Sequence, residues 1–222
     1  MKRTILACLK FERTDLPLVP ALSAGLAVAG EILALIIGLT EHDSAAFAIP
    51  AAFLLYVGAF FCMLFAAAYL SHNYSMLLQF SATRRGLLAG LCLHSLLTSA
   101  LCEVFAVVFS LLLGAVNRNV FFAGMTGSLF QVTPWYGFVL ALVLPILLGI
   151  IISGVILRFG KAGGWALYIL FIGVCITTDR WLGFFQQALL TAAGPAVLAG
   201  LALALLALTG LCVRWLLKAP VK

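Results

Sequence analysis

Long apolar runs, separated by short charged or turn-forming segments, constrain this 222-residue chain more than any other feature. A helix that crosses a membrane needs about 20 mostly apolar residues. Because the membrane interior has no water to hydrogen-bond with the backbone, such runs form helices. These runs also lack the alternation of every second residue that is typical of the strands of a membrane β-barrel. The sequence therefore predicts an all-α membrane protein with six transmembrane helices. We expect the spans at Leu16–Thr40, Ile49–Ser71, Gly86–Gly114, Tyr136–Leu157, the short run Gly164–Thr178, and Leu189–Leu217.

Composition supports the membrane assignment and excludes several other classes. Hydrophobic residues make up 65% of the chain and charged residues only 9%, whereas soluble domains have about 25% charged residues. A water-soluble enzyme, a nucleic-acid-binding domain, a disordered chain and a disulfide-stapled secreted module are all inconsistent with these values. We expect one transmembrane domain over residues 1–222, with an outer connection at Ala115–Trp135.

The positions of the basic residues predict the orientation. Arg118 and Arg180 are the two basic residues on one side of the predicted spans, and the other eleven lie on the opposite side. Cytoplasmic segments of membrane proteins collect Lys and Arg, so both termini are predicted to be cytoplasmic. The net charge of +6 then reflects orientation, and no nucleic-acid partner is expected.

Residues 1–15 are predicted to form a helix on the inner membrane surface. The apolar stretch Ile5–Leu9 is too short for the core of a signal peptide, and Lys10, Glu12 and Arg13 follow it directly. Apolar side chains of this segment would enter the membrane while its basic residues meet anionic head groups.

Motifs for metal binding, nucleotide hydrolysis and catalysis are missing. None of the six cysteines forms a C-x-x-C pair, so neither a zinc site nor a disulfide framework is predicted. The segment Gly160-Lys161-Ala162 lacks the spacing of a phosphate-binding loop and the Ser or Thr that holds magnesium. We expect no cofactor and no catalytic site in this chain, and any energy from ATP must come from another protein.

Three ionisable residues lie inside predicted spans, namely Glu31, His94 and Glu103. Such residues are costly in a membrane and are functional candidates. Ser95, Ser99 and Glu103 recur every four residues and form one polar stripe, whereas His94 lies on the opposite side from Glu103. The stripe is either the wall of a substrate path or proton-linked site, or polar packing between helices.

The predicted inner loop over residues 72–85 carries an amphipathic pattern. Tyr74, Leu77 and Leu78 fall on one helical face, and Phe80 adds apolar surface. A short helix of this kind can fit a socket on a soluble partner. Thr83 can cap the following helix, while Arg84 and Arg85 anchor it at the head groups. An ordinary basic turn between two spans is the alternative.

The run from Phe80 to Gly90, FSATRRGLLAG, resembles the loop of small bacterial permeases of the type-two ABC exporter family. Those loops read approximately F-G-x-[ST]-R-[RK], and Ser81 departs from the usual Gly. The resemblance implies an ATP-driven exporter of a hydrophobic or amphipathic substrate in the bacterial inner (plasma) membrane. It also implies a second permease copy or paralogue and two soluble ABC ATPases that bind ATP and magnesium. The expected ATPase-coupling residues are Tyr74, Leu77, Leu78, Gln79, Phe80, Thr83, Arg84 and Arg85.

The same resemblance implies a re-entrant segment at residues 179–194, after the short fifth span. Two other functions remain open. A membrane subunit of a vitamin-type importer would enclose a small molecule near Trp135, Tyr136 and Trp181. A membrane enzyme would have to use Glu31, His94 or Glu103.

Overall fold

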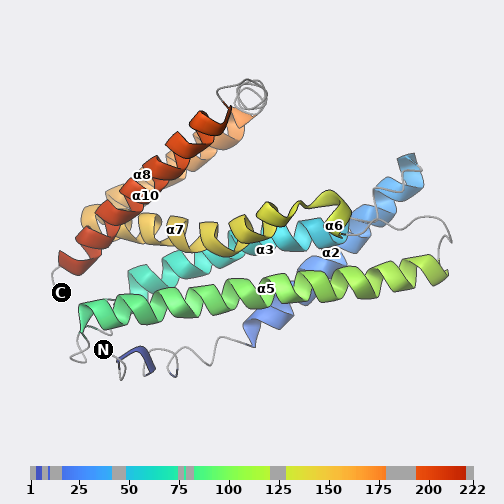
Figure 1. The fold of residues 1–222 in the computed structure, drawn as a ribbon, viewed down its shortest axis with the longest axis horizontal. Coiled ribbons are helices and arrows are strands. Elements are labelled where there is room, and N and C mark those ends of the chain that lie inside the picture. Colours follow the sequence, from blue (N-terminus) through green and yellow to red (C-terminus); the bar gives the residue numbers. More distant parts are fainter. Residues whose placement is uncertain are drawn as a thin grey trace. The chain divides into compact units, whose positions relative to one another are not determined.

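The computed structural model shows a chain built from helices, which Figure 1 labels in sequence order. It describes residues 4–6, 10, 17–41, 49–74, 78, 83–120, 129–178 and 194–218. No strand occurs among these residues. The elements are α2 (Leu18–Glu41), α3 (Ile49–Ala68), the π-helix η3 (Tyr69–Asn73), α5 (Arg84–Val120), α6 (Leu129–Val132), α7 (Trp135–Phe159), α8 (Lys161–Ile176) and α10 (Gly194–Lys218).

Five of these helices are long and apolar enough to cross a membrane, which makes the chain a multi-pass membrane protein. The crossing stretches are Leu18–Ile37, Pro50–Asn73, Arg84–Leu112, Trp135–Phe159 and Ala196–Lys218. Each overlaps a predicted span. The remaining apolar helix, α8, has 16 residues and is therefore about 24 Å long. This is shorter than the hydrocarbon core of about 30 Å, so α8 does not meet the length of a full crossing.

Two helices differ from the expectation. Helix α5 continues to Val120, six residues beyond the predicted end, and α6 occupies part of the predicted outer loop. The polar residues Asn117, Arg118 and Asn119 lie within α5, beyond the crossing stretch that ends at Leu112. The predicted surface helix falls almost entirely outside the described residues, as does the predicted re-entrant segment.

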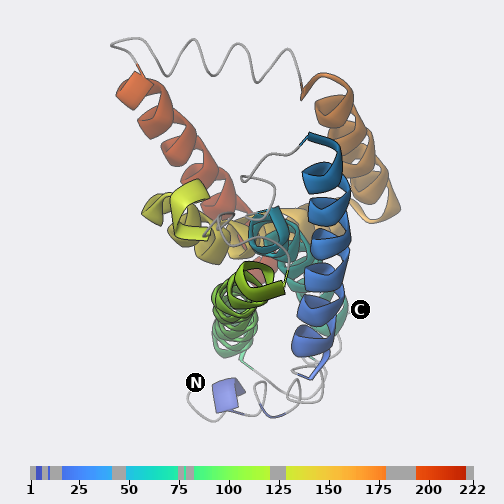
Figure 2. The same ribbon diagram turned by 90° about the vertical axis from the view of Figure 1, so that its right-hand side faces the viewer.

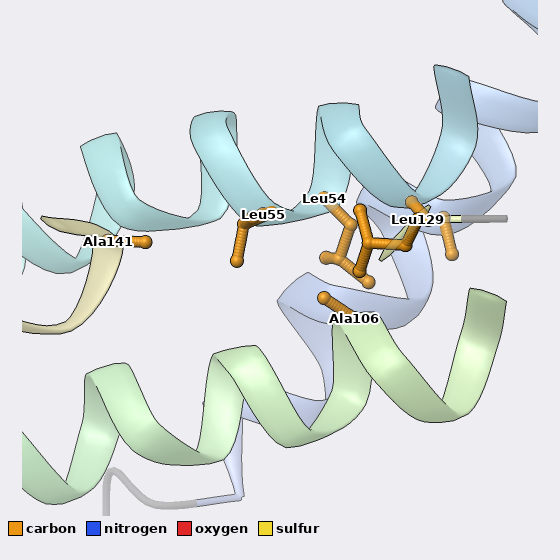
Figure 3. Close-up of a cluster of buried hydrophobic side chains, with 7 residues drawn as sticks. Leu54, Leu55, Ala106, Leu129 and Ala141 are labelled. Atoms are coloured by element: carbon orange, nitrogen blue, oxygen red, sulfur yellow. The ribbon is translucent and has the colours of Figure 1, made fainter. Parts of the chain in front are cut away.

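The described chain divides into two units, and each is considered by itself. The first unit holds Met1–Ala66 and Arg85–Ile146. Its core contains small and branched side chains from α2, α3, α5, α6 and α7. Figures 1 and 2 show these helices as ribbons. Figure 3 shows Leu54 and Leu55 on α3 facing Ala106 on α5, with Leu129 beside them. Leu54, Ala106 and Leu129 are fully buried.

Helices α2 and α3 approach closely because a glycine faces a proline. A Cβ added at Gly30 would lie 2.7 Å from Cα of Pro50. Pro50 is tolerated because it lies in the first turn of α3, where its missing N–H has no helical partner. Close backbone approach through small residues is the usual way in which helices pack in a membrane.

The second unit holds Ala67–Arg84 and Leu147–Lys222. Gly160 joins α7 to α8 with φ of 62°, a left-handed conformation that favours glycine. Helices α7 and α10 pack closely at Gly154, where an added Cβ would lie 2.7 Å from Cβ of Cys212. Toward the ends of the same helices, the rings of Phe159 and Trp215 meet edge to face at 5.7 Å. These contacts bring the carboxyl ends of α7 and α10 together.

Candidate functional site

The candidate site is the segment Ala67–Arg84, which packs within the second unit. The sequence predicted that Tyr74 and Leu78 would form an exposed apolar face. The structure buries both residues, with exposed fractions of 1% for Tyr74 and 9% for Leu78. These two side chains therefore pack inside the protein. Leu77, Gln79 and Phe80 lie outside the described residues.

The phenol of Tyr74 binds the end of the last helix. Its Oη donates a hydrogen bond of 2.9 Å to the backbone carbonyl of Leu216 in α10. The last four carbonyls of a helix have no partner within the helix, and α10 ends at Lys218, so this bond satisfies a group that the helix leaves open. Burial raises the pKa of Tyr74, whereas the nearby charge of Arg84 lowers it. The raised pKa favours the neutral phenol that can donate this bond.

Arg84 makes the neighbouring contact. Its Nη1 donates a hydrogen bond of 2.8 Å to the carbonyl of Leu217. The carboxyl end of a helix carries a partial negative charge, which a guanidinium stabilises. Arg84 is also the first residue of α5. We refer to Tyr74 and Arg84, with the carbonyls of Leu216 and Leu217, as the α10 anchor. It connects both ends of the 74–84 segment to the end of one helix.

A second contact holds the beginning of the segment. Ser153 in α7 is fully buried, and its Oγ lies 3.0 Å from the carbonyl oxygen of Ala67 and 2.6 Å from that of Gly149. Directly after Ala67 and Ala68 the chain adopts the π-helix η3, which leads into Tyr74. Single turns of π-helix are frequent at functional sites. The segment is thus attached to α7 at its start and to α10 at its end.

The remaining predicted coupling residues lie at the start of α5. Thr83 directly precedes the helix, and the side chains of Thr83 and Arg85 are both exposed. The two adjacent arginines thus differ: Arg84 contacts α10, whereas the side chain of Arg85 is exposed.

The predicted intramembrane polar residues all lie in the first unit. Ser99 is buried next to the Cys62 thiol of α3, and Ser23 of α2 is buried next to Cys102. The two cysteines pack together with Val19. Within the described residues, Oγ of Ser23 and Oγ of Ser99 reach no partner in hydrogen-bond geometry. One of the three stripe residues, Ser99, thus packs against α3, while Ser23 of α2 packs against Cys102 of α5.

The other polar candidates are distributed along the same helices. Ser95 is buried and donates to the carbonyl of Leu91 at 3.0 Å. His94 is buried, and its backbone carbonyl accepts a 2.9 Å hydrogen bond from Thr98. Glu31 and Glu103 are half-buried, and each has one carboxylate oxygen that makes no hydrogen bond to the part of the chain described here.

Metal binding finds no support in this arrangement. Over the described ranges, no three His, Cys, Asp or Glu side chains are placed to hold a metal ion. The five described cysteines, Cys62, Cys92, Cys102, Cys175 and Cys212, are free thiols.

Sequence reasoning missed Ser153 and the carbonyls of α10. Ser153 could have been found, because it is the one polar residue within the apolar run from Phe138 to Leu157 and lies next to Gly154. The carbonyls of Leu216 and Leu217 carry no sequence signal, since every residue has one.

Comparison with known proteins finds no matching family model, no similar curated protein and no similar solved structure.

Proposed function

We propose that the chain is the membrane-spanning permease subunit of an ATP-driven exporter of the ABC type. The proposal combines the resemblance of residues 80–90 with one structural observation, the α10 anchor. A permease without its own ATPase needs an element that receives a displacement from a partner and passes it to the membrane helices. The 72–85 loop is such an element, because its two sides are hydrogen-bonded to the last helix.

In this proposal the ATPase contacts the loop between Tyr74 and Arg84, and Phe80 and Gln79 lie in that contact. When ATP draws two ATPases together, the loop moves with its partner. Tyr74 and Arg84 transmit this movement to α10, and Ser153 transmits it to α7. The anchor residues are positioning residues, since they bind the protein's own helix and leave the partner contact to the residues between them.

The proposed topology has six membrane segments in a cell membrane, with both termini cytoplasmic. Helix α8 forms the short fifth segment, and residues 179–194 re-enter from the outer side. Residues 1–15 lie on the inner surface. A second permease copy or paralogue completes the path for a hydrophobic or amphipathic substrate. ATP and magnesium belong to the partner ATPase.

The importer alternative requires an aromatic enclosure near the start of α7. Trp135 and Tyr136 stack edge to face at 6.1 Å, but their exposed fractions are 78% and 56%. Trp181, the third predicted lining residue, lies outside the described residues. The two described rings are therefore too exposed to enclose a small molecule, which favours the exporter.

Site-specific photocrosslinking tests the proposed contact. A benzophenone amino acid replaces Phe80 in the full-length chain, and native membranes are irradiated. We expect a covalent adduct with a protein that carries a phosphate-binding loop. The matched control has the same amino acid at Phe130, which the charge distribution places on the other side of the membrane. An adduct with the same protein from both positions, or no protein adduct at position 80, would contradict the proposal.

A further inference from the structure

One face of α8 presents a cation, two aromatic rings and then aliphatic side chains, in that order along the helix. Lys161, Trp165, Tyr168, Ile172 and Ile176 are spaced by three or four residues and so share this face. Lys161, Gly164, Trp165 and Tyr168 line a shallow depression of about 420 Å³. The rings of Trp165 and Tyr168 meet edge to face at 5.9 Å and form its wall.

The depth of these residues matches the layers of a membrane leaflet. At about 1.5 Å per residue, Trp165 lies about 6 Å and Tyr168 about 10 Å beyond Lys161 along α8. Trp and Tyr are enriched at the level of the lipid head groups, and Lys or Arg lies further out. Beyond the rings, Ile172 and Ile176 continue the face with apolar surface, as the acyl chains of a lipid require.

Charge at this end of the second unit is of one sign. The contact between Phe159 and Trp215 brings the ends of α7 and α10 together, so Arg158, Arg214 and Lys218 lie at the same end as Lys161. All four side chains are exposed. The sequence of the unit contains one acidic residue, Asp179, which follows the opposite end of α8. Basic clusters of this kind bind anionic head groups.

We infer that this face of α8 is a binding site for an anionic phospholipid. The phosphate lies beside Lys161, the glycerol region contacts Trp165 and Tyr168, and the acyl chains follow Ile172 and Ile176. Gly164 provides the space between the cation and the rings, because an added Cβ there would contact nothing within 4 Å. Aromatic residues alone would hold any phospholipid, and Lys161, the basic side chain that lines the depression, makes the site selective for negative charge.

Quenching of tryptophan fluorescence by brominated lipids tests the site. The full chain is reconstituted in phosphatidylcholine vesicles that contain increasing fractions of brominated phosphatidylglycerol or brominated phosphatidylcholine. The difference between the wild-type chain and Trp165→Phe isolates the signal of Trp165. We expect the phosphatidylglycerol to quench Trp165 at an about fivefold lower mole fraction, since one Lys near a membrane surface contributes about 1 kcal/mol, or about fivefold.

Two matched variants separate the site from general attraction. Lys161→Gln should remove the preference for phosphatidylglycerol, and Lys161→Arg should keep it. Lys218→Gln removes the same charge from the same end of the unit but lies outside the depression, so the preference should persist. Equal quenching by both lipids in the wild type, or an equal loss in the Lys161→Gln and Lys218→Gln variants, would overturn the inference.

Discussion

The hydroxyl of Tyr74 gives the sharpest test of the α10 anchor, because one atom can be removed without changing the shape of the side chain. Tyr74→Phe leaves the carbonyl of Leu216 buried and without its donor. A buried polar group that loses its partner costs about 1–3 kcal/mol. Taking about 2 kcal/mol for this bond, local opening at the end of α10 becomes about 30-fold more frequent.

Hydrogen–deuterium exchange of the full chain in lipid nanodiscs measures this opening directly. Amide exchange follows the population of locally opened states, so peptides that cover the last turns of α10 should exchange about 30-fold faster in Tyr74→Phe. Peptides from α5 around Ala106, in the core of the first unit, should be unchanged.

The matched control is Tyr136→Phe, which removes the same atom from a residue that is 56% exposed. Its exchange at α10 should equal that of the wild type. If Tyr74→Phe leaves α10 unaffected, or if both variants accelerate it equally, the hydrogen bond does not hold the loop to α10 and the reasoning fails.

The remaining predictions concern the same unit. Arg84→Gln removes the charge at the carboxyl end of α10. The loss of about 0.7–1.4 kcal/mol should accelerate amide exchange there by about three- to tenfold, whereas Arg85→Gln should leave the exchange unchanged. Equal effects of the two variants in nanodiscs would refute this difference. Gly154→Ala places a Cβ 2.7 Å from Cβ of Cys212 and should lower the stability in a thermal unfolding experiment in detergent by about 1–3 kcal/mol. In the control Gly200→Ala, the added Cβ has nothing within 4 Å, so the stability should not fall. The pKa of Tyr74 is raised, which means that the folded state favours the neutral phenol. The contribution of Tyr74 to stability is therefore complete below the ordinary pKa of 10.0 and is lost as pH rises through the raised pKa. The absorbance of tyrosinate, compared between the wild type and Tyr74→Phe, should show this late ionisation.

Much of the helical architecture could be predicted from local sequence, because each long apolar run has one stable structure in a membrane. The π-helical turn at Tyr69–Asn73 could not, since no residue pattern there distinguishes it from an ordinary helix. The burial of Tyr74 was also missed. On a short amphipathic segment an aromatic residue suggests an exposed contact face, and its partner Leu216 lies 142 residues away.

The polar stripe shows a similar limit. The four-residue spacing placed Ser95, Ser99 and Glu103 on one side of a helix, but spacing within one helix does not identify the helices that pack against it. Gly58 allows Cys102 to pack against α3, since a Cβ added at Gly58 would lie 2.5 Å from Sγ of Cys102. That approach brings Ser99 next to Cys62.

The central claim is that a separate ATPase drives this chain through the 72–85 loop. Its most direct test is steady-state ATP hydrolysis by the full chain purified in mild detergent from its native membranes, together with any subunits that it retains. We predict that a retained soluble subunit hydrolyses ATP. Both the subunit and the activity should be lost when Phe80 is changed to Asp, but not when Phe130 is changed to Asp. Hydrolysis by the chain alone, or retention of the same activity in the Phe80→Asp variant, would contradict the claim.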